Sequence, residues 1–277
     1  KGPNAIGVTL GNGWYRGNLA WDDRRNVYGD RLGLLMQVVV TYRGGRQETI
    51  ATDAAWKAST GPVLMSEIYH GETYDARLEK PGWSSAGFAD LEWAGVRTVE
   101  HRKDHLVAPA GPPVRRTGEL TPIRMFKTPA GDTVADMGQN LVGWVRLKVQ
   151  GPAGTTVKLR HAEVLDKEGN FYTENLRAAK QTVRYTLRGG GAEVYEPHFT
   201  FQGFRFVAVD GYPGQLTPES LTGIVVHSDM APAGTLETSK PLVNQLQHNI
   251  VWGQKGNFVD VPTDCPQRDE RLGWTGD

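Results

Sequence analysis

The chain has 277 residues, of which 39% are hydrophobic and 22% are charged, and its 31 Lys and Arg balance its 31 Asp and Glu. This is an ordinary globular composition, long enough for two domains and part of a third, and it argues against a disordered or fibrous protein. The zero net charge gives no reason to expect a nucleic acid or an anionic membrane as partner, and no apolar run approaches the roughly 20 residues that span a bilayer.

Residues 1–110 are expected to form an N-terminal β-sandwich. The first residues show no apolar signal-peptide core, and the compartment stays open. An apolar stretch at 5–10 ends in a Gly-Asn-Gly turn, and the β-branched stretch 34–42 is turned back by Gly44-Gly45 toward 47–50. Long helical periodicity is missing, and the Pro- and Gly-rich segment 108–113 is typical of a linker.

Residues 114–228 are expected to form a second antiparallel β-sandwich. Segments 145–149 and 156–160 alternate apolar with polar residues and are separated by a Pro-Ala-Gly turn. Segments 181–188 and 204–209 follow the same period of two. Short strands spaced by turns, with almost no helical pattern, favour a sandwich.

Residues 229–277 change to a helical pattern. Ser239 can cap a helix, Pro241 suits its first turn, and Leu242, Leu246 and Ile250 recur on one face. We expect this face to pack against the second sandwich or against a helix outside these residues. One helix and a loop form no domain, so the sequence predicts the first helix and loop of a truncated helical domain.

The closing loop, residues 264–277, concentrates ionisable groups: it holds four carboxylates and two arginines in fourteen residues, with a tryptophan. For most charge clusters a solvated surface turn is the simpler interpretation. Here the mixture also suits glycoside hydrolysis, in which a pair of carboxyl groups acts as proton donor and base across the glycosidic bond. Cys265, the only cysteine, excludes an internal disulfide, and we interpret it as a small buried residue.

The run DCPQRDERLGWTGD at 264–277 resembles the signature of the inverting bacterial α-L-rhamnosidases, at the mouth of their (α/α)6 barrel. LGNGWYRG at 10–17, YGDR at 28–31, TDAAWKAS at 52–59 and GETYDAR at 71–77 resemble the family's N-terminal sandwich. DMGQNLVGWV at 136–145, RHAEVLD at 160–166 and FTFQGFRFVAV at 199–209 resemble its concanavalin-like sandwich. The resemblance implies a mainly β chain: two consecutive antiparallel β-sandwiches of jelly-roll or lectin-like type at 1–110 and 114–228, then the start of the barrel at 229–277.

The resemblance also implies site residues. The family's general acid falls on Glu270, and Asp264 and Asp277 fall on carboxylates that bind the rhamnose hydroxyls. Arg268 and Trp274 fall on further substrate-binding positions.

Two neighbours of Glu270 have a structural interpretation, because we expect Asp269 and Arg271 to form a salt bridge that braces the loop. An ordinary Glu has a pKa near 4.3 and a useful general acid one nearer ~6–7. The neighbouring aspartates would raise the pKa of Glu270 and the arginines would oppose them, and the sequence leaves the balance open.

The implied function is hydrolysis of terminal α-L-rhamnosyl residues, with inversion, from glycosides, oligosaccharides or polysaccharides. The family's general base is a later Glu, beyond Asp277, so residues 1–277 alone are expected to be inactive without the remainder of the barrel as partner. The alternative is a non-catalytic carbohydrate-binding or scaffolding pair of sandwiches, which would have no need of the 264–277 loop.

No cofactor is required for this chemistry, but some related N-terminal sandwiches bind rhamnose through calcium. Asn12, Asp53, Glu72 and Asp75 supply oxygen ligands of the kind calcium prefers. Their spacing matches no metal loop. The simpler interpretation is that Asn12 lies in a turn and that Glu72, Asp75 and Arg77 form a structural polar cluster.

Overall fold

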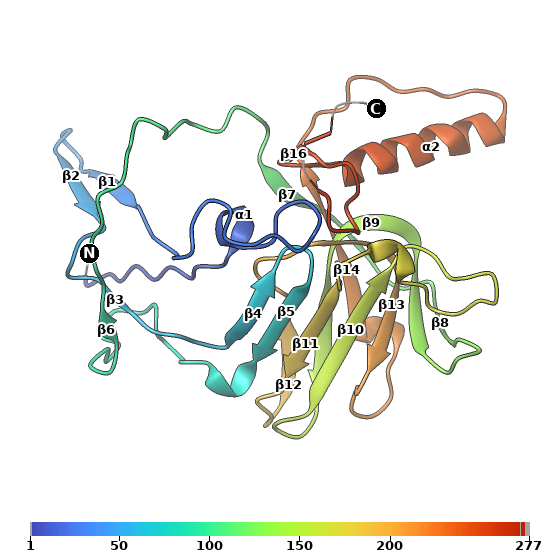
Figure 1. Ribbon diagram of the computed structural model, residues 1–277, viewed down its shortest axis with the longest axis horizontal. Coiled ribbons are helices and arrows are strands. Elements are labelled where there is room, and N and C mark those ends of the chain that lie inside the picture. The colour runs from blue at the N-terminus through green and yellow to red at the C-terminus, as the bar shows by residue number, and fades with distance from the viewer. Residues whose placement is uncertain (1, 272, 275–277) are drawn as a thin grey trace.

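The computed structural model describes residues 2–271, 273 and 274 (Figure 1). A ten-stranded sheet forms its centre, the N-terminal segments lie to one side of that sheet, and a single long helix lies across its upper end. The mainly β class predicted from the sequence is confirmed.

The N-terminal segments outside the large sheet carry short elements. These are α1 (Gly13–Arg16), β1 (Gln37–Thr41), β2 (Gln47–Ala51), β3 (Lys57–Ala58), η1 (Ala76–Leu78) and β6 (Ala94–Gly95). β1 and β2 form the predicted hairpin, and Gly44 and Gly45 take the positive φ angles (95° and 84°) of its turn. Residues 5–10 form no strand, because an apolar stretch becomes one only where a neighbouring strand accepts its backbone hydrogen bonds.

The large sheet has the order β4-β5-β11-β10-β13-β9-β14-β7, and β12 and β8 also pair with β9. Its strands are β4 (Val63–Glu67), β5 (Gly71–Asp75), β7 (Val114–Leu120), β8 (Arg124–Lys127), β9 (Thr133–Gln150), β10 (Thr156–Ala162), β11 (Thr182–Thr186), β12 (Ala192–Tyr195), β13 (Gln202–Asp210) and β14 (Leu221–Ser228). The 3-10 turns η2 (Glu174–Leu176) and η3 (Pro218–Ser220) precede β11 and β14. The core contains the fully buried Leu147, Phe204 and Leu221.

β4 and β5 belong to this sheet although they come from the first 110 residues, a connection that the sequence analysis did not predict. β5 lies parallel to β11, with Gly71 opposite Thr182, whereas the other strand pairs of the sheet are antiparallel. Gly71 has φ +107°, and a Cβ there would lie 2.0 Å from the Thr182 carbonyl oxygen. Only glycine therefore allows β5 to begin this close to β11.

The predicted helix is confirmed as α2 (Pro241–Gly256), with Pro241 in its first turn. Its N-cap is Lys240, which makes no side-chain capping bond, and not Ser239. Leu242 is 85% exposed, and Leu246 and Ile250 are also exposed, so the prediction that this face packs against the second sandwich is wrong.

The opposite side of α2 makes the contact with the sheet. Trp252 packs against the main core, and Gly256 lies close enough to Val142 that a Cβ would meet it at 3.2 Å. After α2, β15 (Phe258–Val259) and β16 (Val261–Pro262) form a short hairpin. Within the described residues, no helix combines the length and apolarity needed to cross a membrane.

Candidate functional site

The loop that follows β16 is closed at its base. Thr263 forms an antiparallel bridge with Gly273, and the Trp274 backbone N–H donates to the Pro262 carbonyl at 3.3 Å. The Thr263 N–H donates to the Asn257 carbonyl at the end of α2, at 2.7 Å. These backbone bonds fold the intervening residues into a compact loop, which brings side chains several positions apart into contact.

Three of the predicted site residues meet inside this loop. Arg268 donates from Nε to Oε2 of Glu270 at 2.9 Å. Its Nη2 lies 2.8 Å from the same oxygen and 3.5 Å from Oδ2 of Asp264. The Asp264 and Glu270 side chains are only 19% and 16% exposed. Arg268 thus joins the two carboxylates and fixes their separation, because a guanidinium presents several donors in one plane.

Cys265 lies beside this group, since its sulfur and the carboxylate oxygens of Asp264 and Glu270 all lie within 4.8 Å of one another. It is half-buried, and burial raises the pKa of its thiol to about 11. The thiol therefore keeps its proton at neutral pH. Arg268 supplies a positive charge between the two carboxylates.

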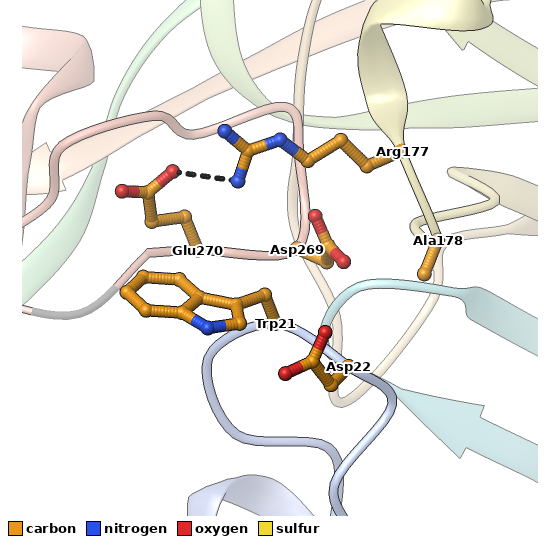
Figure 2. A pocket seen from close by; sticks show the side chains of 6 residues that line it. All are labelled: Trp21, Asp22, Arg177, Ala178, Asp269 and Glu270. Carbon is orange, nitrogen blue, oxygen red and sulfur yellow. Dashed lines mark hydrogen bonds and ion pairs between the residues drawn. The ribbon is translucent and has the colours of Figure 1, made fainter.

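A residue from the segment that precedes β11 completes the surroundings of Glu270. Arg177, directly after η2, donates from Nη1 to Oε2 of Glu270 at 3.1 Å (Figure 2). It has a left-handed backbone conformation with φ 55°, which is uncommon for a residue with a side chain. Nothing in the sequence distinguishes Arg177, which lies 93 positions from its partner.

A pocket of about 600 Å³ opens beside Glu270 (Figure 2). Its lining is drawn from three distant parts of the chain: Trp21, Asp22, Arg177, Ala178, Asp269 and Glu270. Trp21 is 51% exposed, whereas Asp269 is almost fully buried and its Oδ1 has no hydrogen-bond partner among the described residues. The pocket therefore combines an exposed ring with charged groups of both signs.

Arg271 holds the loop against the sheet, but not through the predicted salt bridge with Asp269. It is fully buried, and its Nη1 donates to the carbonyls of Ile68 and Phe201, both at 2.7 Å. Its guanidinium lies against the rings of Tyr69 and Phe201. No Arg271–Asp269 ion pair forms among the described residues. The two carbonyls take Nη1, whereas Nε and Nη2 of Arg271 are buried without a hydrogen-bond partner there. Burial lowers the pKa of Arg271 to about 9, so it remains charged at neutral pH.

The last two predicted site residues belong to the C-terminal end of the chain. Trp274 is 53% exposed and lies outside the pocket lining. Asp277 lies outside the residues that the structure describes.

Each of the calcium candidates has a partner of its own. The Asn12 amide donates to the Ser66 carbonyl at 3.2 Å, and Asp53 accepts from the Ala55 N–H at 2.8 Å. The remaining two are buried in the sheet. Glu72 accepts from the Tyr195 hydroxyl and from both the backbone and the ring of His198, and Asp75 is bound by Arg77. Asn12 is the N-cap of α1, and Glu72 and Asp75 belong to separate groups of partners.

Comparison with known proteins gives one consistent result. Three models of a single family match successive parts of the chain: the α-L-rhamnosidase N-terminal domain (residues 1–118), the bacterial α-L-rhamnosidase concanavalin-like domain (126–227) and the bacterial α-L-rhamnosidase six-hairpin glycosidase domain (231–277). An α-L-rhamnosidase of Streptomyces avermitilis is 48% identical over the whole chain, which spans 27% of that relative.

Solved structures similar to this chain are also α-L-rhamnosidases. A native α-L-rhamnosidase from Aspergillus terreus matches 96% of this chain with a TM-score of 0.93 and 50% identity, and the S. avermitilis enzyme complexed with L-rhamnose matches 95% with a TM-score of 0.91 and 49% identity. The matched part is 31% of the first of these chains and 26% of the second. The chain belongs to the bacterial α-L-rhamnosidase family.

Proposed function

We propose that the protein that contains this chain hydrolyses terminal α-L-rhamnosyl residues from rhamnosides with inversion, and that Glu270 is its general acid. The family membership and the relative solved with L-rhamnose support the substrate class. The carrying observation is the position of Glu270: a largely buried carboxyl that is held by Arg268 and Arg177 and lines an open pocket.

Five residues of the loop take part in the proposed reaction. Glu270 donates a proton to the departing glycosidic oxygen. Asp264 and Arg268, with Trp274 and Asp277, bind the rhamnose ring. In an inverting pair the base stands about 6.5–9.5 Å from the acid, with the attacking water between them. We assign that base to a carboxylate beyond Asp277. Asp264 does not suit this role, because Arg268 pairs with it and with the proposed acid, Glu270, at the same time.

The test compares two substrates that differ in the leaving group. Glu270→Gln should lower kcat/KM by about 10²–10⁴-fold on an alkyl rhamnoside, whose leaving oxygen must be protonated. An activated aryl rhamnoside should lose much less, because its leaving group departs without a proton. The matched control is Asp264→Asn, which should weaken both substrates alike, since a contact with the rhamnose is lost whichever group departs.

Two results would contradict the proposal. Equal losses on both substrates in Glu270→Gln, with the leaving-group dependence in Asp264→Asn, would reverse the two roles. Rhamnoside binding without turnover by the complete wild-type protein would favour the carbohydrate-binding alternative.

A further inference from the structure

The pocket beside Glu270 lies apart from the residues assigned to rhamnose. Its lining includes Glu270 and Arg177 but neither Asp264 nor Arg268. Glu270 is therefore shared between two groups of residues, the Asp264–Arg268 pair and the pocket wall. A general acid contacts the glycosidic oxygen, which joins the sugar to the leaving group. If one group holds the sugar, the other faces the leaving group.

The wall opposite Glu270 is a loop of the N-terminal region with an uncommon backbone. Ala20, Asp22 and Asp23 all have positive φ, at 61°, 66° and 53°. Such conformations are strained for residues with side chains and persist only where the surroundings hold them. Here they leave the Trp21 side chain half exposed at the pocket (Figure 2).

The surroundings do hold this loop. The backbone N–H of Asn18 donates to both oxygens of the buried Glu67 carboxylate, each at 3.0 Å. Asp23 contacts the Asn18 amide, and its Oδ1 lies 3.2 Å from His70 Nε2. Both anchors, Glu67 and His70, flank the turn between β4 and β5. The loop is thus fixed to the large sheet and not free in solvent.

One hydroxyl group connects this loop to the one that carries Glu270. The fully buried Tyr69 accepts from the Ala20 N–H at 3.0 Å and donates to the Glu270 carbonyl at 2.8 Å. The residue before Trp21 and the proposed acid are therefore bound to the same oxygen atom. These two bonds fix the position of the Trp21 loop relative to Glu270.

Building on the proposed function, we propose that Trp21, Asp22 and Arg177 form the leaving-group side of the substrate site and take a flat ring that carries hydroxyl groups. The Trp21 ring supplies an apolar face for stacking. The Asp22 carboxylate accepts hydrogen bonds from hydroxyls, and the half-exposed Arg177 guanidinium donates them. A sugar ring and a phenolic ring share this chemistry.

The test is carried out in the complete enzyme with three rhamnosides: a methyl glycoside, a disaccharide with glucose as leaving group, and an aryl glycoside. Trp21→Ala should lower kcat/KM by about three- to tenfold wherever the leaving group is a ring, the loss expected for one aromatic contact. The methyl glycoside should be unaffected, because its leaving group is too small to reach Trp21. Trp21→Phe should restore most of the loss.

Tyr28→Ala is the matched control, since it removes a 64% exposed aromatic residue of the same region that does not line the pocket. Loss on the disaccharide alone would identify a sugar as the ring, and loss on the aryl glycoside alone a phenolic group. Equal loss on all three substrates, or on none, would overturn the inference. The Glu270→Gln result decides the proposed function separately, because Trp21 takes no part in proton transfer.

Discussion

Tyr69→Phe removes a single oxygen atom that two loops share. The ring stays, and with it the contact with the Arg271 guanidinium. What is lost is the bond accepted from the Ala20 N–H and the bond donated to the Glu270 carbonyl. Burial raises the pKa of Tyr69 to about 12, so in the wild-type protein the hydroxyl donates throughout the working pH range.

The magnitude follows from the burial of Tyr69, which has no exposed surface. A buried polar group left without a partner costs about 1–3 kcal/mol, and the substitution leaves two such groups in part-buried positions. Water that reaches one of them would reduce the sum, so we expect a loss of about 2 kcal/mol in the free energy of unfolding. For a region of this size that lowers the melting temperature by about 5 °C.

The assay pairs thermal unfolding with kinetics. Tyr42→Phe is the control for stability, because the Tyr42 hydroxyl donates to Glu48 on an exposed hairpin, where its loss should change the free energy of unfolding by less than about 0.5 kcal/mol. In kinetics, freeing the Glu270 carbonyl should displace the acid. The kcat/KM of Tyr69→Phe should therefore fall more on an alkyl rhamnoside than on an activated aryl rhamnoside.

Two outcomes would refute this reasoning. A melting temperature as little changed as that of Tyr42→Phe would mean that the two backbone groups find other partners. A lower melting temperature with equal kinetic losses on both substrates would make Tyr69 a structural residue with no part in positioning Glu270.

Two further predictions concern buried charges in the sheet. Asp136→Asn should lower the free energy of unfolding by about 2 kcal/mol in urea titrations, because buried Asp136 pairs with the partly exposed Arg205 and Arg124. Burial opposes its ionisation, but the Arg205 hydrogen bond and its other partners outweigh burial and hold the pKa of Asp136 below its usual range. The wild-type advantage should therefore be complete above about pH 4 and disappear as the pH falls through the folded-state pKa. The hydrogen bond to Glu72 raises the pKa of His198, so their contact should stabilise fully below about pH 6.5 and weaken as the pH rises through the folded-state pKa. Glu72→Gln should flatten this dependence in melting curves at pH 5–9, and an unchanged slope would exclude the contact as its source.

Local patterns in the sequence predicted the elements that depend on local physics. The alternation at 145–149 and 156–160 gave β9 and β10, and the spacing at 241–250 gave α2. The contact of Glu270 with Arg268 is also local, because the two residues are only two positions apart in one loop.

Long-range pairing was not predictable in this way. Arg177 and Tyr69 lie 93 and 201 positions from Glu270, and no motif marks either of them. The apolar face of α2 was predicted incorrectly. Periodicity identified Leu242 as a buried residue, but Leu242 is exposed and Trp252 is the residue that packs against the sheet. A hydrophobic stripe indicates that a face will be covered, but not by which element.

The parallel pairing of β5 with β11 explains how these distant residues reach Glu270. Parallel strands begin at the same edge of a sheet, so the segments that precede them also meet there. The turn before β5 carries Tyr69, and the segment before β11 carries Arg177. Backbone bonds join the two segments, since the N–H of Gln181 donates to the Tyr69 carbonyl at 3.1 Å and the N–H of Thr182 to the His70 carbonyl at 2.9 Å. The register of β5 against β11 thus sets the distance between Tyr69, which binds the Glu270 backbone, and Arg177, which binds the Glu270 carboxylate.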